Sequence, residues 1–373
     1  RDSAAVPGDT AAGRPFVRGG VYDRPYLGRL LGRTAIGGYA EAHARFVRVD
    51  GITEEAGFVA RRFNLFTATQ VSDLVRIGAE LEIEEGGEEV TLEFAAIDVL
   101  LHPALTLRAG MILSPLGRFN LAHDSPLNPF TDRPLVSTEL LGVALSEPGL
   151  GVLGSVGLGG AARVTYEAYL TNGFHDGVIL DAPEGTRVRA GRGNLEDANA
   201  SPAVVGRLAW SPAVGHEVGL SGHYGAYNTF EADGEAIDEP RMLGIFVVDA
   251  ETSVFGVSLA GEGALVGLDL DPAAEGITAA RQRGVYVEAE RVLLRAPFAA
   301  LPESTLSAKA RLDAVDFDAE RRGDSEARIS VGLNLRPTAD TALKLDYVRG
   351  RVRDRFNVPA ETAALLFSVA TYF

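Results

Sequence analysis

The sequence predicts an all-β protein, a transmembrane antiparallel β-barrel of about sixteen strands with an inward-folded third long loop. Three observations support this prediction. From residue 32 onward, apolar and polar side chains alternate in segments of about 9 to 14 residues, the length that a tilted strand needs to cross a bilayer. The connections between these segments alternate between short turns and longer, more charged loops. The chain ends on Phe373, and Leu365, Phe367 and Val369 share its face of the last strand, as expected for a closing strand with a terminal interfacial aromatic.

The chain divides into two regions. Residues 1–31 are rich in Gly, Ala and Pro without a periodic pattern, and we expect an N-terminal extended arm or plug. The alternative is an arm that docks a partner through Phe16, Tyr22 and Tyr26. No signal peptide is visible, so we expect the mature form of an exported protein. Residues 32–373 are expected to form the transmembrane β-barrel.

The expected strands follow from period-two alternation, which places every second side chain on one face. The clearest segments are residues 75–84, 89–94, 105–111, 163–169, 306–313, 328–335 and 343–347, and the terminal strand follows them. The region 241–270 is the least defined, because residues 243–269 can be divided into two strands in several ways.

The connections determine the strand count and the side on which the termini lie. Short turns are expected near residues 67–72, 102–104, 159–161, 212–215, 249–252, 296–303 and 336–340. Long loops are expected near 49–56, 85–88, 114–147, 172–201, 229–241, 270–280, 319–325 and 352–360. These connections join an even number of strands and place both termini on the short-turn side, as in bacterial outer-membrane barrels.

The polar face of the strands is expected to line a water-filled lumen. Charged side chains recur on that face, and each would need a partner in a dry core. A barrel of this size is wide enough to hold water. The predicted pore-lining residues are Arg45, Arg62, Arg76, Glu80, Glu82 and Arg108.

The long segment 114–147 has no strand period and is rich in Pro and Asn. Loops of this length are usually functional or disordered, so we expect it to fold inward and narrow the lumen; the alternative is a surface loop. The predicted constriction-loop residues are Arg118, His123, Asp124, Asp132, Arg133 and Glu139. The four arginines Arg45, Arg62, Arg76 and Arg108 are expected to form a cationic stripe that faces Asp124, Asp132 and Glu139.

Several function classes are disfavoured. The formal net charge of −16 argues against a nucleic-acid partner, and the absence of cysteine excludes disulfides and thiolate metal sites. The six histidines lack metal-ligand spacing, so no metal or cofactor is expected. The GxGxxG pattern at 149–154 is not followed by a helix pattern, and glycines that ease a curved strand explain it better than nucleotide binding. No GxSxG or HExxH motif is present, and we do not expect an enzyme.

The region 61–173 resembles the phosphate-selective porin O and P family and related porin-like outer-membrane proteins. The residues that carry the resemblance include Arg61-Arg62-Phe63, Leu107-Arg108-Ala109-Gly110, Pro115-Leu116-Gly117-Arg118-Phe119-Asn120 with His123, Arg133-Pro134 and Glu147-Pro148-Gly149-Leu150-Gly151. The resemblance covers about a third of the chain, and it implies sixteen strands, a homotrimer and diffusion of small anions. This sequence departs from the basic-lined phosphate channels because Glu and Asp are interleaved with Arg and the loops are mostly acidic.

We therefore expect a porin of the bacterial outer membrane that passes small hydrophilic solutes or ions. The expected partners are outer-membrane lipid, lipopolysaccharide, small solutes or ions, and further copies of the chain. Loop carboxylates offer one route to lipopolysaccharide, through divalent ions that bridge its phosphates. The alternative is a structural barrel that anchors or scaffolds a surface or periplasmic partner.

Overall fold

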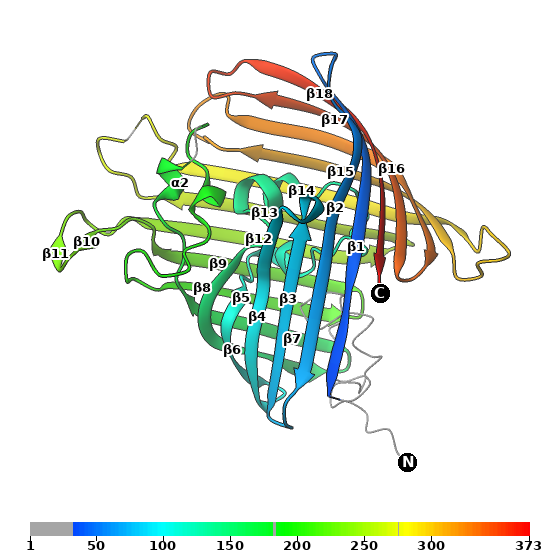
Figure 1. Cartoon of the computed structure of the whole chain (residues 1–373), viewed down its shortest axis with the longest axis horizontal. Helices are drawn as coiled ribbons and strands as arrows, with labels where there is room; N and C mark the ends of the chain where they lie inside the picture. The colour runs from blue at the N-terminus through cyan, green and yellow to red at the C-terminus, as the bar shows by residue number, and fades with distance from the viewer. Residues whose placement is uncertain (1–32, 182–183, 275) are drawn as a thin grey trace.

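The computed structural model describes residues 33–373 apart from 182, 183 and 275, so the predicted arm at 1–31 lies outside the described residues. Sixteen antiparallel strands close into one barrel, which confirms the predicted fold class (Figure 1). Around the barrel they follow the order β1-β18-β17-β16-β15-β14-β13-β12-β9-β8-β7-β6-β5-β4-β3-β2. A separate two-stranded hairpin, β10–β11, projects beyond the barrel.

The barrel strands are longer than the predicted periodic cores. Their bounds are β1 (Thr34–Val49), β2 (Ile52–Gln70), β3 (Val75–Glu84), β4 (Glu89–His102), β5 (Leu105–Leu113), β6 (Ser146–Gly159), β7 (Ala162–Thr171), β8 (Ala203–Ala213) and β9 (His216–Ala226). The second half comprises β12 (Met242–Val254), β13 (Val257–Leu268), β14 (Arg281–Arg295), β15 (Thr305–Asp316), β16 (Ser325–Thr338), β17 (Thr341–Arg353) and β18 (Pro359–Tyr372). The hairpin strands are β10 (Glu231–Ala232) and β11 (Glu235–Ala236).

The helical segments are short and lie in the connections. They are the α-helices α1 (Gly117–Leu121) and α2 (Gly177–Leu180), the π-helix η3 (Val136–Leu141), and the 3-10 helices η2 (Glu85–Gly87) and η4 (Val188–Gly191). Among the described residues, no helix has both the length and the apolar character needed to cross a membrane.

The barrel closes between its first and last strands. β1 pairs with β18 from Tyr39 opposite Tyr372 to Val49 opposite Thr362. The ring of Phe373 stacks on Phe63 of β2 with 5.3 Å between centroids, and the Phe373 amide donates to the Gly38 carbonyl. Tyr372 points to the opposite face and is buried. The terminal aromatic thus covers the outside of the closure, as the alternation of the last strand predicts.

Two predicted connections are wrong. The first long loop, expected near 49–56, is a two-residue turn at Asp50-Gly51, and the strands continue through the rest of that range. The turn expected near 249–252 lies at Phe255-Gly256. All four turn residues have positive φ, the geometry of tight hairpin turns that match the twist of the strands. Asp-Gly is a strong sequence signal for such a turn.

The GxGxxG segment lies in β6, as predicted. A Cβ on Gly151 would lie 2.1 Å from the Ala168 carbonyl oxygen of β7, too close for any side chain. Close approach of two strands therefore explains the glycine.

The main hydrophobic core lies inside the barrel, near the end at which β5 and β7 end and β6 and β8 begin. It joins apolar side chains of the inner wall to apolar side chains of two connections, 114–145 and 172–202. The wall contributes Val205, Leu243, Ile245, Val247, Val266 and Leu268, and the connections contribute Leu116, Leu135, Val136, Leu140, Phe174, Val178 and Val188. The inner wall formed by β8, β12 and β13 is therefore partly apolar, whereas the sequence analysis expected the polar face of the strands to line the lumen.

Candidate functional site

The connection 114–145 between β5 and β6 folds into the barrel, which confirms the predicted inward loop. Its backbone is held by side chains of strands far apart around the wall. The Thr131 amide donates to Asp346 of β17 at 2.8 Å, and the Leu135 amide donates to Asp313 of β15 at 3.0 Å. On another part of the wall, the Gly117 amide donates to Ser221 of β9 at 2.9 Å. We call this segment the inward loop.

Two ion pairs attach the inward loop near opposite sides of the barrel. Asp132 of the loop pairs with Arg45 of β1 at 2.8 Å, and Arg118 of the loop pairs with Glu251 of β12. β1 and β12 are seven strands apart around the sixteen-stranded wall, so the loop spans nearly the full lumen. The side chains of both pairs stay between 22% and 27% exposed, so these charges remain in contact with solvent inside the barrel.

Lysines of the wall support the middle of the inward loop. Lys344 is fully buried, and its ammonium donates to the carbonyls of Ser125 and Phe130 at 2.8 and 3.1 Å. Lys309 pairs with Asp346 at 2.7 Å. Lys309 and Arg311 each place a cation 4.6 Å from the centroid of the Phe130 ring. These cation–π contacts and hydrogen bonds hold the loop by its backbone and one aromatic side chain.

The predicted pore-lining residues are brought together mostly with carboxylates of the wall. Arg62 is buried within 3.4 Å of Glu41, Glu82 and Glu84. Arg76 and Arg108 both pair with Asp98, at 2.9 and 2.8 Å. The predicted pore-lining Glu80 is buried and accepts a hydrogen bond from Asn64 at 3.2 Å.

The sequence predicted that four arginines of the wall would face three carboxylates of the inward loop. Among these residues, Arg45 and Asp132 form such a pair. Asp124 accepts a hydrogen bond from Tyr372 at 2.9 Å, next to the barrel closure, and Glu139 pairs with Arg189 of the following loop at 2.6 Å. Arg133 donates to the His123 carbonyl at 3.5 Å. The predicted stripe, with four arginines opposite three carboxylates, is therefore corrected to one contact between the wall and the inward loop, Arg45–Asp132, and three arginines that pair with carboxylates of the wall. The reason is that carboxylates on adjacent strands lie closer to these arginines than the loop does.

His123 fixes the first part of the inward loop to β4. Its imidazole is buried, with Nδ1 2.7 Å from the Asn120 carbonyl and Nε2 3.4 Å from Glu93. Burial by itself would lower the pKa of His123, but attraction to Glu93 and a hydrogen bond with it raise the pKa to about 9. At neutral pH the ring therefore carries a charge that holds it against the acidic wall.

Asp132 is the other titrating group of the inward loop with a resolved shift. Burial would raise the pKa of its carboxyl, but attraction to Arg328 and Arg45 lowers it below the ordinary value. Both ends of the Arg45–Asp132 contact are thus charged at neutral pH.

A second connection, 172–202 between β7 and β8, packs against the inward loop. Arg192 donates to the Gly142 carbonyl at 2.6 Å, and Phe174, Val178 and Val188 join the same core as Leu140. Arg187 forms two hydrogen bonds to Asp324 and lies 4.0 Å from the centre of the Phe317 ring, which ties this connection to the one between β15 and β16. This packing was not predicted. A sequence signal for apolar packing inside the barrel was present in the run at 243–248, which is almost entirely apolar on both faces of β12.

The wall residues that support the inward loop were predicted to face the lumen but not to form part of the site. Lys309, Arg311 and Asp313 share one face of β15, and Lys344 and Asp346 share one face of β17. The alternation of polar and apolar residues along β15 and β17 shows that these side chains point inward. Their contacts depend on the path of the inward loop, which the alternation does not show. No group of three or more His, Asp and Glu residues suited to a metal ion occurs in the described part of the chain.

Comparison with known proteins agrees with this architecture. No family model matches the chain. An uncharacterized protein of Aquifex aeolicus (strain VF5) is 32% identical over 147 residues, which are 38% of this chain, and the match spans about a third (32%) of that relative's length.

The fold resembles several solved barrels. The outer membrane channel DcaP of Acinetobacter baumannii has a TM-score of 0.57 with 11% identity, over 91% of this chain and 97% of that one. OprB of Pseudomonas putida gives 0.58 with 11% identity, over 96% of this chain and 100% of the other. The trimer form of OmpT, an outer membrane protein of Vibrio cholerae, gives 0.54 with 10% identity, over 91% and 100%. The chain therefore has a barrel fold similar to that of these outer-membrane proteins.

Proposed function

We propose that this chain is a porin of the bacterial outer membrane, a non-enzymatic channel through which small hydrophilic solutes and ions diffuse. The observation that carries the proposal is the inward loop, which spans the lumen and keeps the Arg45–Asp132 and Arg118–Glu251 pairs in contact with solvent. A loop that crosses a wide barrel narrows its lumen, and charges beside the remaining water filter solutes by polarity and charge. The likeness to the outer membrane channel DcaP supports the same reading.

The resemblance to phosphate-selective porins is best tested through charge. Arg62 and Arg108, which lie in the resembling region, are each paired with wall carboxylates. Three carboxylates surround Arg62, and Arg108 shares Asp98 with Arg76, so carboxylates reduce the positive charge that a phosphate site needs. We therefore propose a general pore rather than a phosphate-specific one. We further propose a homotrimer, since OmpT of the same fold has a trimer form; the mass of the detergent-solubilised complex measures this directly.

The test is conductance in planar bilayers. We expect discrete channels from the folded protein, and we expect the double variant Arg45→Gln/Arg118→Gln to shift the reversal potential toward cation preference. The shift should be a measurable part of the roughly 59 mV that a perfectly selective monovalent channel shows in a tenfold salt gradient. Arg291→Gln is the matched control, because Arg291 is an exposed arginine of β14 near the short-turn end.

Two results would count against the proposal. Folded protein that forms no channels would remove the porin function altogether. An unchanged reversal potential in the double variant, with channels intact, would show that the Arg45–Asp132 and Arg118–Glu251 pairs do not filter ions, and it would leave the porin assignment standing.

A second candidate is a structural barrel that anchors a surface or periplasmic partner. The observation in its favour is the hydrophobic core inside the barrel, where the connections 114–145 and 172–202 pack on the wall. A packed interior of this kind stabilises a scaffold and restricts the lumen. Folded protein without conductance would favour this function.

A further inference from the structure

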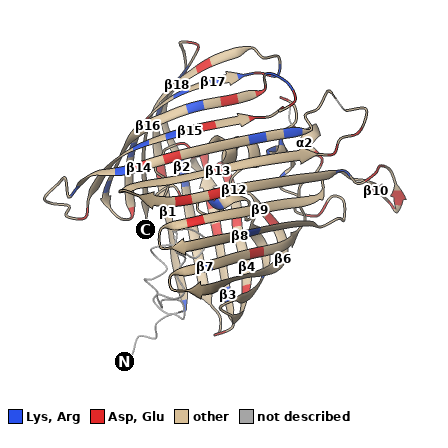
Figure 2. Ribbon diagram, turned by 180° about the vertical axis from the view of Figure 1, so that it is seen from behind, with Lys and Arg blue, Asp and Glu red and all other residues tan. Residues whose placement is uncertain are grey.

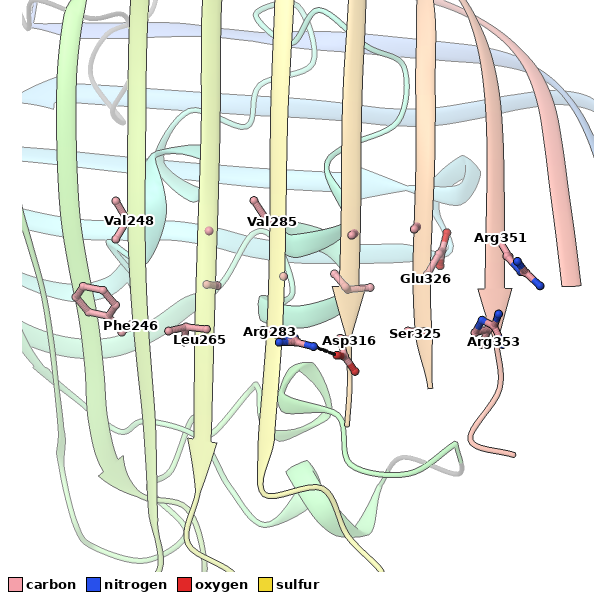
Figure 3. Close-up of a pocket in the computed structure, with 16 residues that line it drawn as sticks. Phe246, Val248, Leu265, Arg283, Val285, Asp316, Ser325, Glu326, Arg351 and Arg353 are labelled. Carbon is pink, nitrogen blue, oxygen red and sulfur yellow. Dashed lines mark hydrogen bonds and ion pairs between the residues drawn. The ribbon is translucent and has the colours of Figure 1, made fainter. Parts of the chain in front are cut away.

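A hollow of about 630 Å³ lies on the outer wall of the barrel, across strands β12 to β17 (Figure 3). It is near the end of the barrel that carries the connections 114–145 and 172–202, because β12, β14 and β16 begin there and β13, β15 and β17 end there. If the chain is the outer-membrane porin proposed above, this end faces the outer leaflet.

Strand register explains the shape and the chemistry of the hollow. Two adjacent rows of outward residues cross the six strands. One row runs Phe246, Leu265, Arg283, Asp316, Ser325 and Arg353, and the other runs Val248, Gly263, Val285, Ala314, Ala327 and Arg351. Both rows start on large apolar side chains and end on arginine, and small side chains at Gly263, Ala314 and Ala327 leave the floor low.

The β17 end of the hollow is basic (Figure 2 shows charge along these strands). Arg349 and Arg351 are half exposed and share the single carboxylate of Glu361, at 3.1 and 3.7 Å. Arg353 donates to the neutral side-chain amide of Asn357 at 2.6 Å. In the middle, Arg283 is balanced by Asp316 at 2.8 Å. Glu326 of β16 also borders the hollow, but it alternates with the outward Ser325 and Ala327 and therefore belongs to the inner face. On the outer face, three arginines against one carboxylate leave this end positive.

The hollow is apolar at its β12 end and positively charged at its β17 end. This arrangement fits an amphiphile that has an acyl chain and a phosphate group. Outward arginines at the level of the headgroups bind phosphate through paired N–H donors, and acyl chains fill apolar hollows. A neutral lipid would leave the arginine end unused. A second copy of the chain, which would need a carboxylate cluster aimed at the same end, fits the charge less well.

We propose that this hollow binds lipid A, the phosphorylated glycolipid anchor of lipopolysaccharide. One acyl chain lies over Gly263, Ala314 and Ala327, and a phosphate meets Arg351 and Arg353. The proposal rests on the outer-membrane placement proposed above, and its residues face away from the lumen. It can therefore fail while the porin function holds.

The experiment is native mass spectrometry of the detergent-purified protein titrated with hexa-acylated diphosphoryl lipid A, with phosphatidylethanolamine as the neutral comparison. We expect Arg351→Glu/Arg353→Glu to weaken lipid A binding by about tenfold or more, the scale of losing one charge-assisted contact pair. Gly263→Leu should also weaken it by filling the floor. A Cβ at Gly263 would meet its nearest atoms at 3.9 and 4.0 Å, so the leucine is compatible with the backbone.

Arg291→Glu is the matched control, an outward arginine of the same sheet near the opposite end, and it should bind lipid A as the parent does. Channel conductance, measured in parallel, should be the same in all variants and reports the porin function separately. Equal loss in Arg291→Glu would mean unspecific charge attraction and would overturn the proposal. Unchanged binding in the double variant and in Gly263→Leu would also overturn it. If Gly263→Leu breaks an oligomer while lipid A still binds, the hollow is an interface between copies.

Discussion

For single residues, the sequence predicted the face of the strand on which a side chain lies, but it did not predict which opposite charge the side chain contacts. The alternation of β3 places Glu80 and Glu82 inside, and both are buried there. The expectation that Arg62 would face the inward loop is wrong, because Glu41, Glu82 and Glu84 surround it. A buried charge takes the nearest opposite charge available, and strand neighbours lie about 5 Å away whatever the loop does.

His123 gives a pH prediction at this scale. Its pKa of about 9 is above the ordinary value of about 6.5, so its contribution to stability is fully present below about pH 6.5 and is lost as the pH rises through 9. We expect cleavage of the inward loop by proteinase K to rise between about pH 7 and 10, after correction for the pH dependence of the protease on an unfolded substrate. His123→Gln should remove this pH step, because glutamine does not titrate. The same step in both proteins would show that another group controls the loop.

At the scale of elements, the terminal strand behaves as its alternation predicts. Phe373 lies outside on Phe63, while Tyr372 points inward and contacts both Tyr39 and Asp124. One strand thus closes the barrel on its outer face and holds the inward loop on its inner face.

The Phe63–Phe373 stack should contribute a measurable coupling energy. A double-mutant cycle with Phe63→Ala, Phe373→Ala and the double variant should give about 0.5 to 1.5 kcal/mol, the range for aromatic pairs beyond burial. The measurement is the free energy of unfolding by urea in lipid vesicles. Additive losses would mean that the two rings stabilise the closure independently.

At the scale of the whole molecule, the barrel interior is one packed unit shared by the wall and two connections. Leu140 is fully buried between the inward loop and β14, and residues of 172–202 belong to the same core. The two connections should therefore open together although only one of them crosses the lumen.

Leu140→Ala tests this cooperation. Removing a buried leucine costs about 2 to 5 kcal/mol, and we expect faster hydrogen exchange in residues 172–202 as well as in the inward loop, with the strands unchanged. Leu180→Ala is the control, since Leu180 is 71% exposed. Exchange that rises in the inward loop alone would show that the connections open separately.

Sequence patterns alone predict the closed all-β barrel, the faces of the strands, the inward loop and the outward position of Phe373. These follow from local rules: period-two alternation, turn chemistry and connection length are written along the chain. The three-dimensional arrangement was needed to show which charges pair and that the lumen holds a hydrophobic core. It also shows that small side chains from β13, β15 and β16 form the floor of one hollow that ends on Arg351 and Arg353. Such contacts join residues far apart in sequence, and they depend on strand register and on the path of the loop.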